Sequence, residues 1–268
     1  MNFKPLIKKI ANRAMDSHKY DFGKILLVGG NLTMPGAIIL SALGALRSGA
    51  GVIHVATRKG HLPLLLANDP SFIIHEIETE QDLDVLYKKE SFDAIGIGPG
   101  LGRDKWASLL YQKTISARVP LVIDADALFF MDQKIQSCVI TPHWGEACRL
   151  TKVEKEAETT REEMVELLHH FSDVVLLKGH QTIISEKEKM QYVNQTGCSV
   201  LSCAGSGDVL TGVITSFLGQ GLSLFEASSL ASYLHGLAGD EIKSRDGVVG
   251  TSSKDIAFEI RRLINNIR

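Results

Sequence analysis

Residues 204–208 read Ala-Gly-Ser-Gly-Asp and stand directly before apolar residues at helical spacing, so a turn of small residues opens onto a helix. Backbone N–H groups at a helix start attract anions, and Gly205 and Gly207 let a ligand come close to the main chain. Asp208 would stand beside a bound phosphate, which its carboxylate repels. Its use there would be to take a proton from a hydroxyl, or to orient that hydroxyl toward phosphorus. The alternative is that Asp208 caps the helix or is an ordinary acid of its first turn.

Two further polar groups follow apolar runs. The segment Lys-Gly-His-Gln-Thr at 178–182 places Lys178 and Gly179 at a strand end, where they are suited to contact phosphate or ribose or to form an ordinary turn. Asp124 and Asp126 end another apolar run, and either position a metal or water or cap the helix that follows. Each of these alternatives stays open from the residues alone.

Histidines mark two other candidate positions. His143 follows an apolar run and is suited to hydrogen-bond a substrate, although a lone histidine at a strand end is often structural. As a metal site, His143 and Glu146 offer too few ligands. His235 and Asp240 lie in a late helical segment with two glycines, which favours buried polar groups at a helix contact over chemistry.

Two familiar nucleotide-binding motifs fail. A dinucleotide fingerprint that uses Gly98, Gly100 and a third glycine would need that glycine where Arg103 stands. The Gly-Lys pair at 23–24 is followed by isoleucine and does not form a P-loop. The small-residue turn therefore belongs to neither class.

Short apolar runs alternate with helical patterns along most of the chain, which predicts βαβ units and a mainly parallel sheet covered on both faces. The predicted strands are 24–30, 52–57, 71–77, 93–100, 119–126, 137–143 and 173–179, and a hairpin is predicted over 181–185 and 189–194. The predicted helices include 35–48, 103–117, 155–170 and most of 206–268. Ligands bind beyond the carboxyl ends of such strands. We therefore expect a single three-layer α/β domain over residues 1–268, with its site at that edge.

Composition limits the possible partners and compartment. The 268 residues carry 29 basic and 31 acidic side chains, a net charge of −2, so no basic surplus indicates nucleic acid or an anionic membrane. The four cysteines form no CxxC pair, which predicts buried free thiols in a reducing compartment. The first apolar stretch is too short for a signal peptide, and we find no run of about 18 apolar residues. The cytoplasm is the expected location.

In their combined order, these segments resemble the ADP-dependent NAD(P)H-hydrate dehydratase family of the ribokinase-like superfamily. The resemblance covers about residues 17–240. Its segments are SHKYDFGKILLVGG, MPGAIILSALGALRSGAG, IGPGLG, VIDADAL, TPHWGE, LKGHQT, GSGDVLTGVI and HGLAGD. The pair MPGA and TPHWGE favours this family over the related sugar and vitamin kinases.

The resemblance implies a ribokinase-like α/β/α sandwich and a repair reaction. The implied substrates are the S-epimers of NADHX and NADPHX, hydrated forms of the reduced nicotinamide cofactors, and dehydration restores NADH or NADPH. The implied phosphoryl donor is ADP, or ATP in its place, together with Mg²⁺ for which no ligands are assigned. Hydroxide leaves poorly, whereas a phosphorylated hydroxyl leaves easily, so a kinase-like site suits a dehydratase.

The resemblance also implies roles for particular residues. Asp208 would be catalytic and would contact the substrate. The nicotinamide half of that substrate would lie against Ala37, Gly100 and His143. The adenine nucleotide would lie against Lys178, Gly179, His180, Gln181 and Thr182, with Gly205 and Gly207 at its phosphates.

Relatives of this kind imply a homo-oligomer, with a tetramer favoured, and many carry an upstream epimerase domain for which this chain has no room. The chain departs from the family pattern at Cys198, Val200, Leu201 and Ala204, and at Tyr20. Loss of a glycine at 204 removes access to positive φ, so we expect altered nucleotide affinity or preference. Two alternatives remain: a small-molecule kinase of the same fold, and a nucleotide-binding protein without catalysis.

Overall fold

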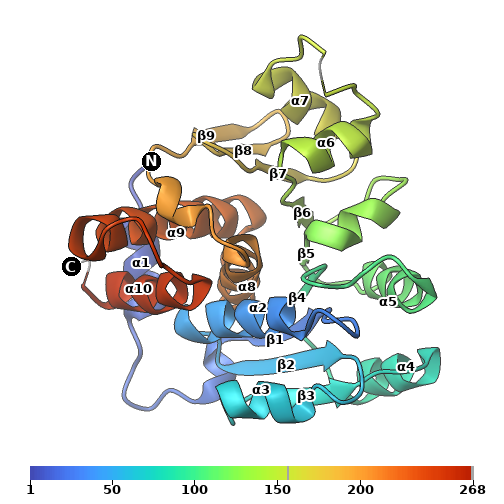
Figure 1. Cartoon of the computed structure of the whole chain (residues 1–268). Coiled ribbons are helices and arrows are strands. Elements are labelled where there is room, and N and C mark those ends of the chain that lie inside the picture. Colours follow the sequence, from blue (N-terminus) through green and yellow to red (C-terminus); the bar gives the residue numbers. More distant parts are fainter. Residues whose placement is uncertain (156, 267–268) are drawn as a thin grey trace.

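The computed structural model describes residues 1–155 and 157–266, and its centre is a nine-stranded sheet (Figure 1). The strand order is β3-β2-β1-β4-β5-β6-β7-β8-β9. The strands are β1 Lys24–Val28, β2 Val52–Thr57, β3 Ile73–Glu76, β4 Ala94–Ile97, β5 Leu121–Ile123, β6 Cys138–Ile140, β7 Val174–Leu177, β8 Ile183–Glu186 and β9 Met190–Val193. Neighbours from β3 to β7 pair in parallel, while β8 and β9 add an antiparallel hairpin. The mainly parallel sheet and the hairpin are both confirmed.

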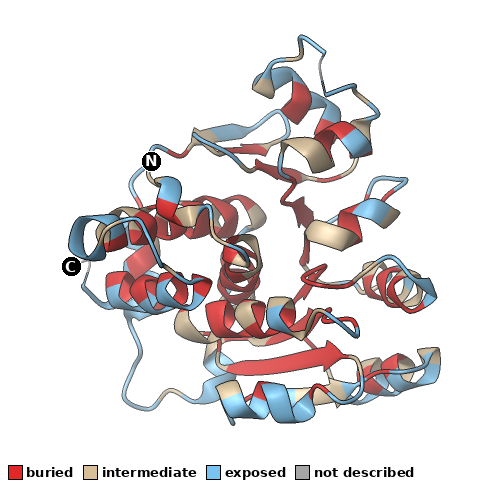
Figure 2. Ribbon diagram, viewed as in Figure 1, coloured by how far each residue is buried: buried red, intermediate tan, exposed pale blue. Residues whose placement is uncertain are grey.

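The central strands are buried because both faces of the sheet are covered (Figure 2). In β1, Ile25 and Leu27 enter one apolar core while Leu26 and Val28 enter the other. Successive side chains of a strand point to opposite faces, so a continuous apolar run suits a strand with a core on each side.

Helices form the two outer layers. One layer contains α1 Lys4–Ala11, α2 Pro35–Arg47, α3 Leu62–Asn68, α8 Ser206–Gly219, α9 Leu224–Asp246 and α10 Ser253–Asn266. The other contains α4 Glu80–Lys89, α5 Lys105–Ile115, α6 Trp144–Thr151 and α7 Arg161–Leu168. The three-layer α/β/α prediction is therefore confirmed. In the described parts of the chain, no helix is long and apolar enough to cross a membrane.

Several predicted elements end earlier or begin later than expected. The helix predicted over 155–170 begins at Arg161, because the Thr160 hydroxyl caps it by accepting from the Glu163 N–H at 3.2 Å; residue 156 lies outside the described residues. The strand predicted over 119–126 ends at Ile123. Its last residues enter the 3₁₀ helix η2, Ala125–Phe130, where Ala125 has φ 49°.

The connections after β1, β4, β5, β6 and β7 meet at the carboxyl edge of the sheet. From β1, the strands β2 and β3 are added on one side of the sheet, and β4 and those after it on the other. In doubly wound folds such a change of direction, here between β1 and β4, leaves a crevice at the carboxyl ends of the strands where ligands bind. A Cβ on Gly98, which has φ 132°, would fall on the Asp124 carbonyl, so glycine is required where these connections touch. The predicted site edge thus gathers loops from five strands.

Candidate functional site

The small-residue turn opens helix α8 at this edge. Gly205 is its N-cap, with φ 85° and ψ −1°, a conformation that favours glycine. The Ser206 N–H donates to the Cys203 carbonyl at 3.3 Å, whereas the N–H groups of Gly207 and Asp208 have no acceptor among the described residues. Two free donors and the helix dipole therefore remain for an anion. Asp208 lies in the first turn but makes no capping hydrogen bond, so the capping alternative is wrong.

Lys178 brings a positive charge to this turn from the end of β7. A Cβ built on Gly207 would lie 3.5 Å from Lys178 Nζ. The same Nζ donates to Asp124 Oδ1 at 2.8 Å and lies 3.9 Å from Glu146 Oε2. The turn has no lysine of its own, and Lys178 supplies the positive charge from the end of β7.

Asp124 is buried, and both of its carboxylate oxygens accept hydrogen bonds from side chains of the protein. Besides its bond from Lys178, it accepts a hydrogen bond from Thr211 Oγ1 of α8 at 2.7 Å. Burial opposes its ionisation, but the charge and hydrogen bond of Lys178, with the Thr211 bond, outweigh burial and hold the pKa of Asp124 below its ordinary value. The interpretation of Asp124 as a helix cap is wrong, because its side chain makes no capping hydrogen bond to η2 and holds Lys178 instead. A role in positioning a metal or water stays a prediction.

The environment of Asp208 changes its acidity. Burial raises the pKa of this carboxyl to about 7, with a further rise from the charge of Asp124, a counteracting effect of Lys178 and a smaller rise from Asp126. A group with a pKa near neutrality suits general acid–base chemistry. Asp208 is thus a carboxylate poised between its two protonation states beside an anion-binding turn.

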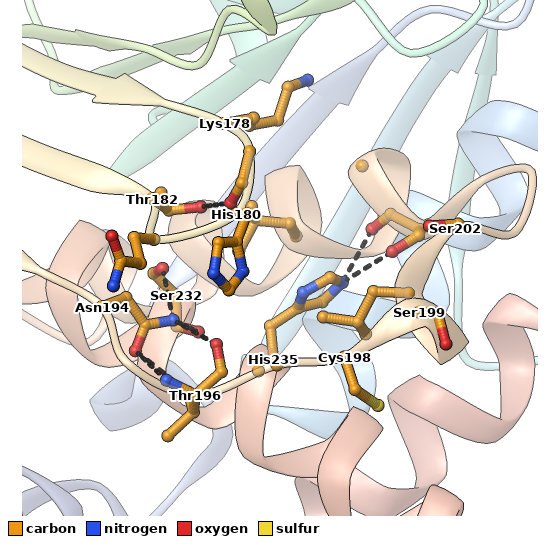
Figure 3. Close-up of a pocket in the computed structure, with 18 of the residues that line it drawn as sticks. Lys178, His180, Thr182, Asn194, Thr196, Cys198, Ser199, Ser202, Ser232 and His235 are labelled. Atoms are coloured by element: carbon orange, nitrogen blue, oxygen red, sulfur yellow. Dashed lines mark hydrogen bonds between the residues drawn. The ribbon is translucent and has the colours of Figure 1, made fainter. Parts of the chain in front are cut away.

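A cavity of about 640 Å³ lies on one side of the turn. Figure 3 shows its walls: the connection from β7 to β8 with His180 and Thr182, the segment after β9 with Asn194 and Thr196, and His235 from α9. A volume of this size suits a mononucleotide. The predicted nucleotide residues from Lys178 to Thr182 and Gly207 all line it, whereas Gly205, predicted with them, does not.

Sequence reasoning missed part of this wall. Asn194 is buried, and its amide donates to Ser232 Oγ at 3.1 Å, while its Oδ1 accepts from Thr196 Oγ1 at 2.9 Å. These bonds tie the segment after β9 to α9. Asn194 and Ser232 are 38 positions apart, and only the helix–sheet packing reveals the pair.

His143 combines a structural position with exposure to the cavity. It is the N-cap of α6, where its Nδ1 accepts from the Gly145 N–H at 3.0 Å and the Glu146 N–H at 3.3 Å. Its side chain is 60% exposed and lines the same cavity. The histidine is therefore oriented by the helix it caps and presents its remaining surface to a ligand.

Ala37 and Gly100 form a second group. A Cβ on Gly100 would lie 2.9 Å from the Cβ of Ala37, so the loop after β4 packs against the first turn of α2. Neither residue lines the 640 Å³ cavity. The structure therefore separates the residues predicted for the nicotinamide half: Ala37 and Gly100 lie together at the β1–β4 crevice, whereas His143 lines the cavity with the predicted nucleotide residues.

His235 and Asp240 of α9 support the site through packing. His235 is buried, and its Nε2 lies 3.1 Å from Ser206 Oγ; burial lowers its pKa to about 4, so the ring is neutral near pH 7. Asp240 Oδ2 accepts from the Gly197 N–H at 2.9 Å. His235 is buried, as expected, and also lines the cavity, whereas Asp240 is half-buried.

The departures near 198–204 leave the turn intact. Ala204 does not adopt positive φ, so alanine fits this position without backbone strain, and the expected change in nucleotide affinity or preference stays a prediction. The Ala204 carbonyl accepts a hydrogen bond from Ser253 Oγ of α10 at 2.6 Å. All four cysteines are free; Cys138 and Cys148 are buried as predicted, while Cys198 and Cys203 are half-buried and line the cavity.

The sheet order, its two helical layers and the anion-binding turn define a ribokinase-like α/β protein. A ribokinase-like superfamily protein of Enterococcus faecalis shares this structure, with a TM-score of 0.87 at 28% identity over 98% of this chain and 94% of that one. The chain belongs to the NAD(P)H-hydrate dehydratase family, whose family model matches residues 25–262.

Similar proteins support this membership. An ADP-dependent (S)-NAD(P)H-hydrate dehydratase of Neisseria meningitidis is 35% identical, over 95% of this chain and 89% of the relative. A bifunctional NAD(P)H-hydrate repair enzyme of Coxiella burnetii is 32% identical, over 99% of this chain and 55% of the relative. The chain thus spans about half the length of such bifunctional relatives. A Bacillus subtilis ADP/ATP-dependent NAD(P)H-hydrate dehydratase, co-crystallised with ATP and Mg²⁺, has a TM-score of 0.85 at 28% identity, over 99% of this chain and 97% of that one.

Proposed function

We propose that this chain catalyses the ADP-dependent dehydration of the S-epimers of NADHX and NADPHX, which restores NADH and NADPH. Family membership and the name of the Neisseria relative support the substrate class. The observation that carries the mechanism is Asp208, whose pKa is raised to about 7 beside two free N–H donors and Lys178. A carboxylate in that position suits removal of a proton from a hydroxyl near a phosphate.

The reaction proposed runs in two steps. Asp208 takes the proton of the hydrate hydroxyl while the hydroxyl oxygen attacks the terminal phosphorus of ADP. The new O–P bond forms and the bond from that phosphorus to AMP breaks. Phosphate then leaves with the C–O electron pair, while a proton leaves the neighbouring ring carbon and the dihydropyridine is restored. The sum is ADP plus hydrate giving AMP, phosphate and the reduced cofactor.

The nucleotide would occupy the 640 Å³ cavity. Its phosphates would meet the N–H groups of Gly207 and Asp208 and the ammonium group of Lys178, which Asp124 holds in place. Positive charge and fixed donors stabilise the charge that develops during phosphoryl transfer. His180, Gln181 and Thr182 would contact the remainder of the nucleotide.

Mg²⁺ fits this site as a companion of the nucleotide. The described residues contain no group of three His, Cys, Asp or Glu side chains able to hold a metal. Mg²⁺ commonly keeps several waters and binds through phosphates and one or two carboxylates. Glu146 would supply such a carboxylate: its Oε2 accepts the His143 N–H at 2.8 Å and lies 3.9 Å from Lys178 Nζ, which leaves its Oε1 for the ion. When bound, the ion would neutralise phosphate charge.

We also propose a homo-oligomer, with a tetramer favoured, that works in the cytoplasm, where NADH and NADPH turn over. The bifunctional names of longer relatives support cooperation with an epimerase activity that interconverts the two hydrate epimers. Light scattering of the purified chain measures the assembly directly: a mass of four chains supports the tetramer, and a mass of one chain contradicts any oligomer.

Product analysis separates the dehydratase from its alternatives. Purified chain, NADHX, Mg²⁺ and either ADP or ATP are incubated, and the nicotinamide and phosphorus products are identified by NMR. The dehydratase predicts NADH, free phosphate and AMP from ADP. A stable phosphorylated acceptor would instead indicate a kinase, and nucleotide binding without any turnover would indicate a non-catalytic protein.

A further inference from the structure

The dinucleotide substrate is longer than the site described so far. Ala37, Gly100 and Asp208 account for its hydrated nicotinamide end, and this inference rests on the proposed function. A pyrophosphate and an adenosine remain, and they carry negative charge and a flat ring. The surface that continues from Gly100 through Gly102 is therefore the place to seek a complementary group.

Arg103 begins that surface, and three neighbours hold it. Its Nε donates to Asp126 Oδ1 at 3.1 Å, and the other oxygen of Asp126 accepts from the Gly102 N–H at 3.0 Å. The guanidinium carbon lies 4.9 Å from the ring centroid of Phe129, and that of Arg149 lies 5.8 Å from the same centroid. We call Arg103, Asp126, Phe129 and Arg149 the Arg103 patch.

The ring at its centre is fixed from behind. Phe129 packs edge-to-face on Phe130, with ring centroids 5.3 Å apart, and Phe130 in turn lies 5.6 Å from Tyr111 of α5. The Arg103 side chain therefore lies on a rigid support and is bound to the same carboxylate as the backbone of the crevice loop. Little side-chain entropy is lost when such a pre-organised guanidinium binds a ligand.

The patch keeps unused binding capacity. The Arg103 side chain is 49% exposed, and its two terminal nitrogens meet no acceptor among the described residues. Phe129 is 46% exposed, so part of its ring is open to contact with a ligand. Two arginines against one aspartate leave a net charge of +1.

Arg58, another arginine at the carboxyl edge, does not expose its guanidinium donors as Arg103 does. Arg58 lies at the same edge, after β2, but its Nε donates to Asn31, one of its terminal nitrogens lies 3.4 Å from Asp104, and its guanidinium covers Trp106. Its side chain is only 20% exposed. Arg58 therefore serves the loop structure, whereas Arg103 presents its terminal donors to solvent.

We propose that the Arg103 patch binds the distal half of the dinucleotide substrate: the terminal nitrogens of Arg103 contact the adenosine-side phosphate, and Phe129 and Arg149 flank the adenosine. Guanidinium forks match phosphate oxygens in charge and geometry. The patch continues directly from Gly100, and Asp126 lies close enough to Asp208 for its charge to act on that carboxyl. The patch thus selects dinucleotide hydrates over mononucleotide hydrates.

A shortened substrate tests this role. Dehydration of NADHX is compared with dehydration of the hydrate of reduced nicotinamide mononucleotide, which lacks the adenosine-side phosphate and the adenosine. Wild-type protein should show the lower KM for NADHX. Arg103→Ala should raise the KM for NADHX about tenfold and change that for the mononucleotide hydrate less than about twofold. The KM for ADP should not change, because the nucleotide cavity has other walls.

Matched variants separate binding from folding. Arg118→Ala removes an exposed arginine before β5, at the opposite edge of the sheet, and should leave both KM values unchanged. Arg103→Lys keeps the charge without the fork and should recover part of the NADHX affinity. Calorimetry of NAD⁺ against nicotinamide mononucleotide adds a readout without turnover, in which Arg103→Ala should remove the preference for NAD⁺.

Each contrary outcome has a distinct meaning. Equal KM values for the two hydrates in wild-type protein, equal losses for both in Arg103→Ala, or no loss in that variant would overturn the distal subsite while the dehydratase stands. Failure of wild-type protein to recover either hydrate with ADP or ATP would overturn the proposed function and the subsite with it.

Discussion

At the scale of single residues, the site depends on three charges at the carboxyl edge of the sheet. Asp124 and Lys178 form an ion pair in which Asp124 is buried and Lys178 is half-buried, and the charges of both act on Asp208. Burial and Asp124 favour the protonated form of Asp208, while Lys178 favours the ionised form. The charged pair of Asp124 and Lys178, together with burial, thus keeps the pKa of Asp208 near neutral pH.

Removal of the Asp208 charge should stabilise the protein. The pKa of Asp208 rises from 3.8 to about 7 on folding, so its ionisation destabilises the folded state increasingly as pH rises from about 4 to 7. Asp208→Asn should therefore increase the free energy of unfolding by roughly 1–3 kcal/mol at about pH 8 and by little near pH 4. Urea unfolding at both pH values measures this difference. Exposed Asp16→Asn is the control, and equal effects of Asp208→Asn at both pH values would contradict the assignment.

Loss of the Asp124 charge should shift the pH dependence of turnover. Without that negative neighbour, and with Lys178 still positive, the pKa of Asp208 falls. The rising limb of kcat/KM against pH, which reports the ionisation of the base, should move to lower pH in Asp124→Asn. Lys178 keeps Glu146 as an anionic neighbour at 3.9 Å but loses its hydrogen bond to a carboxylate, so the variant should also lose about 1–3 kcal/mol of stability.

Thr211→Val provides the matched comparison for this prediction. It removes one hydrogen bond to Asp124 and keeps the ion pair, so stability should fall by about 1 kcal/mol and the profile should shift little. A pH profile of Asp124→Asn that coincides with that of wild type would show that Asp124 does not tune the base.

At the scale of elements, the contact between α2 and α8 positions both halves of the site, because α2 carries Ala37 and α8 carries Asp208. Glycines let these helices approach closely: a Cβ on Gly44 would fall on the Val209 carbonyl, and one on Gly212 would fall on the Ser41 carbonyl. The spacing of the two helices is therefore set by backbone contact.

Gly44→Ala should separate these helices. The added methyl group meets main-chain atoms that cannot rotate away, so we expect a loss of about 1–3 kcal/mol in the free energy of unfolding despite the better helix propensity of alanine. Gly36→Ala in the same helix is the control, since no atom of residues 1–155 or 157–266 lies within 4 Å of its added Cβ. Denaturant unfolding should find that variant unchanged or slightly more stable. Equal effects of the two substitutions would contradict the close packing.

Elements with continuous apolar runs were predictable from the sequence, whereas their ends were not. Lys24–Val28 and Val174–Leu177 are buried strands within the ranges that their apolar residues indicate. The ends depend on single hydrogen bonds such as the Thr160 cap, which a hydrophobic pattern does not report. Within the site, Lys178 and Asp124 were each recognisable as strand-end residues. Their pairing was not, because it depends on the order β5-β6-β7 that brings residues 54 positions apart together.

At the scale of the whole molecule, the sheet separates two cores and its carboxyl edge joins them through the site. The nucleotide cavity is walled by the β7–β8 connection, the segment after β9, and helices α8 and α9. A ligand there bridges segments that are distant in the chain. Its binding should therefore stabilise the folded molecule against global unfolding.

ADP should raise the melting temperature of the wild-type chain. A ligand at 100 times its Kd adds about 2.7 kcal/mol when it binds only the folded state. Lys178→Ala removes the charge beside Gly207 and should abolish most of the shift. Arg118→Ala, far from the cavity, should retain it. A thermal unfolding scan with and without ADP measures these shifts, and an equal ADP shift in Lys178→Ala would exclude Lys178 from the phosphate site.

The central claim is that Asp208 drives ADP-dependent dehydration of a nicotinamide cofactor hydrate. The most direct measurement is the recovery of NADH absorbance from purified NADHX with ADP and Mg²⁺, comparing wild type with Asp208→Asn. We predict recovery with wild type and a loss of at least about a hundredfold in kcat with the variant, which should still bind ADP. No recovery by wild type with ADP or ATP, or full activity of Asp208→Asn, would contradict the account.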